Sequence, residues 1–497
     1  MTATQNYLAL DLGAESGRAI LGQFNGERFQ LSEEHRFPNI PVSVPQKFGA
    51  TSLRWDVLRL WSEVKEGIAK VTRKQGETLT AIGVDTWGVD FGLFDEKGAL
   101  IASPYAYRDN RTDGMMEKAF ERVSQEQIFE QSGIQFLQLN SLYQMLAMVL
   151  DNASELRIAK TFLTMPDIIN YWLTGDMVSE FTIATTTQCY NPRKRKWAYP
   201  LIEAMGIPNY IFPEIVSAGT YLGKIVKTLA EELNTKASII APACHDTGSA
   251  AAAVPSTHDN IAWISSGTWS ILGTNVTDPV INKQSLAHNF TNEGGVDNTF
   301  RFCKNISGLW LVQECRRAWA LEGQEFTYTE LTDLASLAKP LVSFVNSDDP
   351  EFLHPGGMPE RIANYCRRTG QPIPDSKAAF LRCALESIAL KYRYVLENLE
   401  QILGKTLDPI HIVGGGTKNK LLNQFTADAT GKHVISGPAE ATALGNIMMQ
   451  AVALGNIASI QQGREIIRKS CDVSTYEPGD KNPWDVAYGR FIELVEK

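Results

Sequence analysis

Short apolar runs separated by polar turns mark the start of the chain. Residues 7–12 are mainly apolar, and two further runs, 17–24 and 29–33, follow them across short turns. Runs of this length, broken by turn residues, are typical of β-strands joined as hairpins. We therefore predict an antiparallel meander, then a helix over 56–71 and a strand over 81–85, an alternation that indicates an α/β layer.

The same order of elements returns in the second half of the chain. Residues 261–264 are apolar, 265–270 read S-S-G-T-W-S, and 271–274 are mainly apolar again. Such an internal repeat is typical of a duplicated chain. The sequence therefore predicts two related α/β lobes, residues 1–254 and 255–497.

A long amphipathic helix is predicted over 381–402. Its apolar residues recur at alternating steps of four and three, which places them on one face of a helix. Because only about three heptads are present, burial in a core is favoured over a dimerising coiled coil. The oligomeric state, monomer or dimer, stays open.

Composition and charge exclude several classes of protein. The 497 residues are 44% hydrophobic and 21% charged, as in ordinary globular chains. No apolar run reaches the ~18 residues that cross a bilayer, and the start lacks a secretory signal, so we expect a cytoplasmic protein that does not bind membranes. The net charge of −9 disfavours nucleic acid as a partner. The seven cysteines form no C-x-x-C pair, which argues against a disulfide framework or a zinc site.

Two glycine turns are the first candidates for chemistry. D-L-G-A-E-S-G-R at 11–18 and S-S-G-T-W-S at 265–270 each follow a strand-like run. Glycine lets the backbone approach an anion closely, and Ser16, Arg18 and Thr268 add side-chain donors. We predict that both turns contact the phosphates of one nucleotide. Neither has the G-x-x-x-x-G-K-[ST] pattern of an ordinary P-loop.

A third glycine-rich segment, I-V-G-G-G-T-K-N at 412–419, precedes a helical run over 421–430. Bare backbone beside a helix start accommodates a flat ligand and supplies amide donors. Alone, such a segment is more often a plain tight turn. Together with the two phosphate turns, it predicts a contact with ribose and adenine.

Asp246 is the candidate general base. It begins a run of small residues, D-T-G-S-A-A-A-A-V, where the dipole and amides of a helix start keep a carboxylate ionised. Phosphoryl transfer needs a group that accepts the proton of the attacking hydroxyl. An ordinary helix cap is the alternative reading of the same residue. We expect Mg²⁺ to be held mainly by ATP oxygens and water, with help from Asp11 through a water molecule.

Aromatic and polar residues in two motifs are candidates for binding a small polar acceptor. Trp87 and Gly88 lie in D-T-W-G-V-D, and Asp109 lies in Y-R-D-N-R at 107–111. Indole faces stack on the C–H faces of sugars. The alternative is a buried tryptophan and a surface ion-pair loop. Asn305 follows as a further candidate, with a helix cap as its alternative.

The motifs together resemble the FGGY family of carbohydrate kinases over nearly the whole chain. The resemblance rests on D-L-G-A-E-S-G-R, D-T-W-G-V-D-F, Y-R-D-N-R-T, G-I-Q-F-L-Q-L-N-S-L-Y-Q, H-D-T, S-S-G-T-W-S, T-N-E-G-G, G-L-W-L-V-Q, H-I-V-G-G-G and G-P-A-E-A-T-A-L-G-N. It implies an actin-like duplicated ribonuclease H fold with a cleft between the lobes. The first lobe would hold the sugar and phosphate site, and the second the nucleotide site.

The resemblance also implies roles for individual residues. Its ATP contacts correspond to Ala14, Glu15, Ser16, Gly17, Arg18, Thr268, Gln313 and Gly415. Its ketose contacts correspond to Gly88, His245, Asp246, Thr247 and Asn305. Asp246 would be the proton acceptor, and Glu15 stands where a small residue is more usual.

The activity implied is transfer of the γ-phosphate of ATP to the 1-hydroxyl of a ketose, with L-rhamnulose as the best match. Residues 137–146 lack the Lys and Trp pattern of glycerol and xylulose kinases, which weakens those substrates. A kinase of another ketose or polyol remains an alternative. So do a nucleotide-switched protein of the actin or chaperone type and a catalytically silent sugar sensor.

Overall fold

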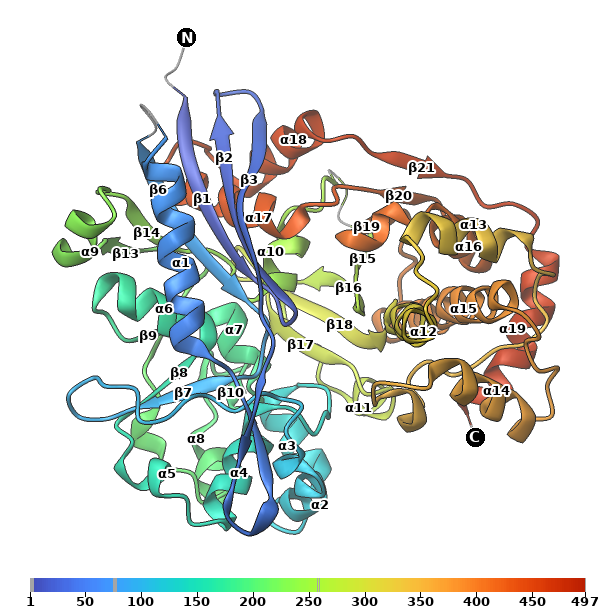
Figure 1. The fold of residues 1–497 in the computed structure, drawn as a ribbon, viewed down its shortest axis with the longest axis horizontal. Coiled ribbons are helices and arrows are strands. Elements are labelled where there is room, and N and C mark those ends of the chain that lie inside the picture. Colours follow the sequence, from blue (N-terminus) through green and yellow to red (C-terminus); the bar gives the residue numbers. More distant parts are fainter. Residues whose placement is uncertain (1–3, 75–77, 257, 259, 497) are drawn as a thin grey trace. The chain divides into compact units, whose positions relative to one another are not determined.

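The computed structural model describes residues 4–74, 78–256, 258 and 260–496. Its elements form two compact units (Figure 1). The first unit comprises 1–257, 275–302 and 441–470, and the second comprises 258–274, 303–440 and 471–497. Two segments beyond residue 254 thus return to the first unit. The two-lobe division at 254 and 255 stays a prediction.

A six-stranded sheet forms the centre of the first unit. Its order is β13-β14-β6-β1-β2-β3, with β1 and β2 antiparallel, β2 and β3 antiparallel, and β6 parallel to both β1 and β14. The predicted meander is therefore present. The strands are β1 (Gln5–Leu12), β2 (Ser16–Phe24), β3 (Phe29–Pro38), β6 (Leu79–Thr86), β13 (Thr220–Lys224) and β14 (Ser238–Ala241).

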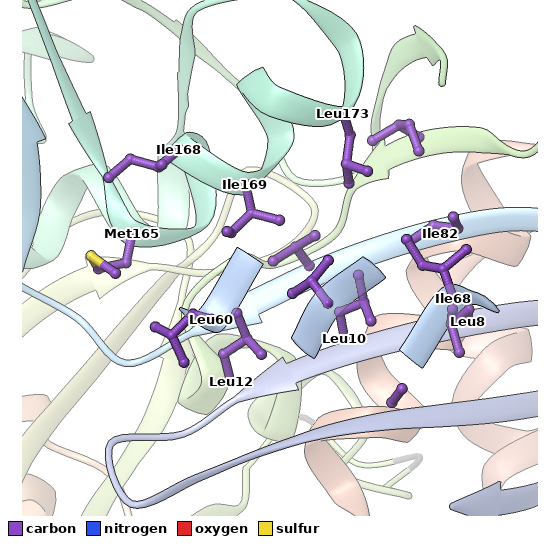
Figure 2. Packing of buried hydrophobic residues seen from close by; sticks show 14 of the residues in the cluster. Leu8, Leu10, Leu12, Leu60, Ile68, Ile82, Met165, Ile168, Ile169 and Leu173 are labelled. Carbon is purple, nitrogen blue, oxygen red and sulfur yellow. The ribbon is translucent and has the colours of Figure 1, made fainter. Parts of the chain in front are cut away.

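Alternate residues of β1 divide between the two faces of this sheet. Leu8, Leu10 and Leu12 are buried in one apolar cluster with residues of α1 (Val57–Thr72) and α6 (Met165–Thr174). Figure 2 shows these leucines beside Leu60 and Ile169. Side chains two apart in a strand point to the same face, and burial of each leucine contributes roughly 1.5–3 kcal/mol.

Helix α17 (Ala441–Ala453) lies against β1 and β6 on the other face, as the red helix beside blue strands in Figure 1 shows. Gln450 donates to Leu8 O (3.0 Å) and Asn446 to Gly83 O (3.2 Å). A Cβ on Gly83 would lie 2.4 Å from Asn446 Oδ1. Glycine in β6 therefore lets the polar side chains of α17 reach the sheet.

Helix α10 (Asp246–Ala252) packs closely on α17. A Cβ on Gly445 of α17 would lie 1.9 Å from the carbonyl oxygen of Ser249 in α10. The glycine and the small residues of α10 thus permit contact between the two backbones. This contact fixes the helix that begins with Asp246.

Shorter elements complete the first unit and surround a second apolar cluster that includes Phe129, Tyr143 and Phe162. Its remaining strands are β4 (Val42–Pro45), β5 (Thr51–Arg54), β7 (Phe91–Phe94), β8 (Thr161–Thr164), β9 (Val178–Glu180), β10 (Tyr190–Asn191), β11 (Lys196–Trp197), β12 (Glu214–Val216) and β17 (Thr291–Gly294). Its remaining helices are α2 (Met115–Phe120), α3 (Gln125–Ser132), α4 (Ser141–Leu150), α5 (Ser154–Ile158), α7 (Phe181–Thr186), α8 (Tyr199–Ala204), α9 (Lys227–Glu232), α11 (Lys283–Ala287) and α18 (Ile460–Ser470).

A second sheet belongs to the second unit. This sheet has seven strands, and five of them follow the order β16-β15-β19-β20-β21, in which β15, β19 and β20 are parallel and the two outer pairs antiparallel. They are β15 (Ala262–Ser266), β16 (Trp269–Val276), β19 (Ile410–Val413), β20 (Val434–Ser436) and β21 (Ser474–Tyr476). The predicted repeat of strand, glycine turn and strand is present in β15 and β16.

The long predicted helix is α15 (Lys377–Leu403). The Ser376 side chain caps its start by accepting a hydrogen bond from Ala379 N, and Gly404 ends it with a positive φ of 64°, as helix-capping preferences lead one to expect. Leu381, Leu385 and the other apolar residues of the predicted face are largely buried. The helix is therefore a core element of the second unit.

The other elements of the second unit are α12 (Trp310–Leu321), α13 (Tyr328–Leu337), α14 (Met358–Arg368), α16 (Lys420–Thr430), α19 (Asn482–Val495) and β18 (Phe300–Ser307), whose first residues belong to the first unit. All seven cysteines are free thiols. Within the described part of the chain, none of the helices combines the length and apolar character that crossing a bilayer requires.

Candidate active site

Three motifs of the first unit meet at the carboxyl ends of its parallel strands. Asp11 on β1 lies opposite Asp85 on β6, and Thr86 at the end of β6 forms a bridge with His245. Open α/β sheets bind their ligands at this edge. The D-L-G-A-E-S-G-R, D-T-W-G-V-D-F and H-D-T motifs, far apart in the sequence, thus form one region.

Backbone hydrogen bonds fix the three segments to one another. Trp87 N donates to Leu12 O (3.3 Å), and Thr86 N donates to Cys244 O (2.9 Å). The D-T-W-G-V-D segment therefore lies between the first glycine turn and the loop that carries Asp246.

The first glycine turn joins β1 to β2 as predicted. A Cβ on Gly17 would come within 2.2 Å of the Phe37 ring, so only glycine fits there without a shift. Arg18 Nη2 donates to Asp11 Oδ2 (2.5 Å), whereas Glu15 at the tip is exposed. The predicted ATP contacts Ala14, Glu15, Ser16, Gly17 and Arg18 all lie on this turn or at the start of β2. Their contact with ATP stays a prediction.

Asp246 is the first residue of α10, and its side chain is 31% exposed. Its Oδ1 accepts hydrogen bonds from Thr247 N (2.5 Å) and Thr247 Oγ1 (3.1 Å). The described residues give Oδ2 no hydrogen bond. One carboxylate oxygen is thus fixed by its neighbour, while the other is available to a proton donor.

His245 lies in a buried cluster with an ion pair. Arg301 Nη2 is 2.9 Å from His245 Nδ1 and 3.0 Å from Glu293 Oε2. Arg301 Nε also donates to Gly294 O (2.8 Å), and His245 N donates to Thr182 Oγ1 (3.1 Å). The ring is therefore held on its Nδ1 side, while Nε2 lies 3.4 Å from Asp246 Oδ1.

Asp85 is a fully buried carboxyl group at the centre of this region. Burial raises its pKa well above the ordinary value, the negative charges of Asp11 and Asp246 add to the increase, and a hydrogen bond from Asn446 opposes it. That bond joins Asn446 Nδ2 to Asp85 Oδ2 at 2.5 Å. Asp85 thus responds to charge at both Asp11 and Asp246.

Trp87 is buried, as the alternative reading of its motif had it. Its ring lies 4.3 Å from that of Trp55, and its Nε1 donates to Asp90 Oδ2 (2.9 Å). A Cβ on the neighbouring Gly88 would lie 3.1 Å from Thr186 Oγ1, so the backbone there is closely packed. A sugar contact by Trp87 or Gly88 stays a prediction, and for Trp87 the structure favours a core role.

Asp90 connects this motif to α4. Its Oδ1 accepts a hydrogen bond from Gln144 Nε2 (2.9 Å), and burial raises its pKa to about 6. Asp109 accepts from Leu53 N (2.6 Å) and Arg111 N (3.0 Å). One oxygen of Asp109 therefore holds its own loop and the other holds β5, and its predicted ligand contact stays untested.

The second unit contains a pocket of about 610 Å³ beside the second and third glycine segments. Gln313 and Gly415, two of the predicted ATP contacts, line it. Within the described part of the chain, the buried Gln313 Oε1 lacks a hydrogen-bond partner, and a Cβ on Gly415 would meet nothing within 4 Å. The other lining residues are Gly267, Leu309, Val312, Tyr328, Thr329, Leu331, Thr332, Asp333, Leu381, Leu385, Gly416, Lys418, Asn419 and Lys420.

The glycines of the third segment have different roles. Gly414 has a φ of 85°, and a Cβ on Gly416 would lie 2.0 Å from Ser266 Oγ. Gly414 is therefore needed for its backbone conformation and Gly416 for close packing. Of the three glycines, only Gly415 has free space where a side chain would be. Thr268 lies in the second turn, where its carbonyl accepts from Gly308 N (3.1 Å).

Sequence reasoning missed four residues of these regions. Asp85 and Asp90 flank the predicted Trp87 and Gly88, and their buried acidic character was the available signal. Glu293 lies in T-N-E-G-G, one of the motifs that carry the resemblance, but its pairing with Arg301 across β17 and β18 is visible only in the fold. Asn305 belongs to β18 in the second unit, and its ketose contact stays a prediction.

Comparisons with known proteins cover nearly the whole chain. Residues 6–253 match the N-terminal domain, and residues 262–454 the C-terminal domain, of the FGGY family of carbohydrate kinases. A rhamnulokinase of Bacteroides thetaiotaomicron is 42% identical over 492 residues, 99% of each chain. A rhamnulokinase of Bacillus subtilis is 36% identical over 475 residues, 95% of this chain and 96% of the relative.

Solved structures match the fold. A ligand-bound xylulose kinase from Lactobacillus acidophilus aligns with a TM-score of 0.80 at 16% identity, over 99% of this chain and 97% of that one. A Plasmodium falciparum glycerol kinase with ADP aligns with a TM-score of 0.79 at 17% identity, over 99% and 98%. The predicted actin-like α/β fold is confirmed.

Proposed function

Because the chain belongs to the FGGY family of carbohydrate kinases, we propose that it transfers the γ-phosphate of ATP to the 1-hydroxyl of L-rhamnulose. The products are L-rhamnulose 1-phosphate and ADP. That the chain is an ATP-dependent carbohydrate kinase follows from the family. The observation that supports L-rhamnulose is the match to rhamnulokinases over nearly the full length of both chains. We place the reaction in L-rhamnose breakdown in the cytoplasm.

Asp246 is the proposed general base. The bond between the sugar O1 and the γ-phosphorus forms, the bond from that phosphorus to the β,γ-bridging oxygen breaks, and the O1 proton moves to Asp246. Its partial exposure and its available Oδ2 support this role. Such assistance is typically worth ~10² to 10⁴ in rate. ADP leaves with the electron pair of the broken bond.

The first glycine turn is the proposed phosphate contact of the first unit. Arg18 supplies positive charge and N–H donors, which suit phosphate oxygens. Asp11 is the proposed carboxylate for a Mg²⁺ ion through water, and such an ion, when bound, neutralises phosphate charge. A single carboxylate suits an ion that keeps most of its waters.

The pocket of the second unit is the proposed nucleotide site. Its volume suits a small organic ligand, and Gln313 Oε1, which has no hydrogen-bond partner among the described residues, is an acceptor for an amino or hydroxyl group. The open side of Gly415 leaves room for a flat ring. Thr268, on the neighbouring turn, is the proposed phosphate contact of this unit.

An acceptor panel tests the proposal. ADP release, coupled to a spectrophotometric assay, is measured with L-rhamnulose, L-fuculose, D-xylulose, L-ribulose and glycerol at equal concentrations. We expect the highest kcat/KM with L-rhamnulose and a product phosphorylated at O1 by NMR. Preference for another acceptor would reject the substrate and keep the reaction class. The absence of acceptor-dependent ADP release would instead favour a nucleotide-switched protein or a sensor.

A further inference from the structure

The imidazole of His245 lies in a buried cluster whose other members the proposed reaction does not use. Arg301 is 1% exposed, Glu293 5% and His245 7%. They come from β18, β17 and the residue before α10. A buried charge needs a partner, and the 3.0 Å contact between Arg301 and Glu293 supplies one.

Arg301 decides which nitrogen of His245 carries the proton. Its Nη2 is 2.9 Å from His245 Nδ1. A guanidinium remains protonated and has donors but no acceptor, so this contact is a hydrogen bond only when Nδ1 accepts. In the neutral ring the proton is then on Nε2.

Glu293 favours the other tautomer. Its Oε2 lies 3.3 Å from His245 Nδ1 and would accept a proton from that atom. The same oxygen is closer to Arg301, at 3.0 Å, and a proton on Nδ1 would point two donors at each other across 2.9 Å. The guanidinium therefore outweighs the carboxylate at Nδ1.

The far side of the ring supports the same assignment. His245 Nε2 is 3.4 Å from Asp246 Oδ1. A lone pair on Nε2 would face a carboxylate oxygen, whereas an N–H group there is attracted to it.

We propose that Arg301, its charge balanced by Glu293, is a positioning residue that holds His245 as the Nε2–H tautomer, so that the ring presents an N–H donor beside Asp246 to an oxygen of the ketose. The role toward the ketose rests on the proposed function, whereas the tautomer does not. Arg301 acts only through His245.

The tautomer is read directly by ¹⁵N NMR. The full-length protein is labelled with ¹⁵N at its histidine rings, and a His245→Gln variant identifies the signals of His245 among the seven histidines. Long-range ¹⁵N–¹H correlations distinguish a protonated from an unprotonated ring nitrogen. We expect protonation at Nε2 in the parent protein.

Variants test the cause. The double variant Arg301→Gln with Glu293→Gln removes the obligatory donor without leaving a buried charge unpaired. We expect a mixture of tautomers and a fall of about 10- to 100-fold in kcat/KM for the ketose, the size seen for residues that orient metal-ligating histidines, with the KM for ATP unchanged. Arg301→Lys retains a cation without an acceptor and should retain the Nε2–H form.

Arg382→Lys is the matched control. Arg382 Nε contacts Glu386 Oε1 at 2.7 Å in another largely buried ion pair, where no histidine contact occurs among the described residues. We expect normal ketose kinetics and an unchanged His245 signal. If Arg301 has only a structural role, the Arg301→Gln, Glu293→Gln double variant and Arg382→Lys should both lower stability and leave the His245 tautomer unchanged.

Three results would overturn the proposal: an Nδ1–H signal for His245 in the parent protein, an unchanged tautomer in a folded double variant, or a changed tautomer with normal ketose kinetics. The parent spectrum decides even if the double variant does not fold. If no sugar is phosphorylated by the parent, the proposed function fails while the tautomer assignment is still measured.

Discussion

Asp246 has the local setting that a proton acceptor needs. Thr247 holds Oδ1, the side chain remains partly exposed, and the residue begins a helix that is fixed by backbone contact with α17. The alternative reading was a helix cap. The proton-acceptor and helix-cap interpretations predict different effects of replacing the carboxylate with an amide.

Asp246→Asn separates them. The amide oxygen of asparagine can still accept the hydrogen bonds from Thr247, but the amide cannot accept the hydroxyl proton, so we expect kcat to fall ~10²- to 10⁴-fold with unchanged ATP affinity. Coupled ADP release and calorimetric titration with ATP measure the two quantities. Asp56→Asn, at the residue that caps α1, is the control and should keep full activity. Normal turnover of Asp246→Asn would exclude Asp246 as the base.

A motif that carries its own chemistry marks single residues as candidates. Asp246, Arg18 and Gly415 stand out by residue type and position. Glu293 and Arg301 do not, because an ion pair formed across two strands leaves no spacing in the sequence. Trp87 shows the opposite case, since an aromatic residue in a sugar-like motif is buried against Trp55.

Contact between elements in the first unit depends on glycine. Helices α10 and α17 touch at Gly445, where a Cβ would overlap the backbone of Ser249. Neither partner is a flexible side chain, so one of the two helices must move if a side chain is added. A shift of α10 would affect the site most directly, because this helix begins at Asp246.

Gly445→Ala should therefore reduce both stability and turnover. Overpacking of this kind typically costs about 1–3 kcal/mol, so we expect a fall of several degrees in Tm and a lower kcat. Differential scanning fluorimetry and the coupled assay measure them. The control is Gly489→Ala in α19, where a Cβ meets nothing within 4 Å and a helical alanine is stabilising by ~0.5–1 kcal/mol. Equal effects of the two substitutions would contradict the close helix contact.

Strong periodicity explains which elements were predictable. The 381–402 pattern predicted α15, and alternating apolar runs predicted the meander of β1, β2 and β3. The role of α17 was not predictable, because its buried Asn446 and Gln450 bind the backbone of strands several hundred residues earlier. The periodicity of a helix does not indicate which sheet the helix packs on.

Across the molecule, buried carboxyl groups couple stability to pH. Burial raises the pKa of Glu180 to about 7, that of Asp167 to about 7 and that of Asp90 to about 6. Glu180 accepts hydrogen bonds from Cys244 N and Thr182 N (3.0 and 2.9 Å). The same groups ionise at lower pH in the unfolded chain. Between the unfolded and the folded pKa values, the folded state therefore binds more protons than the unfolded state.

The contribution of these groups to stability should therefore be greatest below their unfolded pKa values, which lie near 4. It should fall as the pH rises through their folded pKa values of about 6 and 7. Each unit of pKa difference is worth about 1.4 kcal/mol. We expect the Tm to decrease from pH 5 to pH 8, and Glu180→Gln to flatten that slope. Exposed Glu96→Gln is the control and should leave the curve unchanged. A Tm that rises over this range for the parent and both variants would contradict the assignment.

The return of residues 441–470 to the first unit has a consequence for how the protein is made. On the ribosome, β1 and β6 emerge early, but the helix that covers one of their faces emerges only after more than four-fifths of the chain. Domains usually fold as they leave the ribosome. Here one face of β1 and β6 stays uncovered until a segment near the end of the chain has been translated. A prematurely terminated polypeptide would therefore lack part of the core even around its first strands.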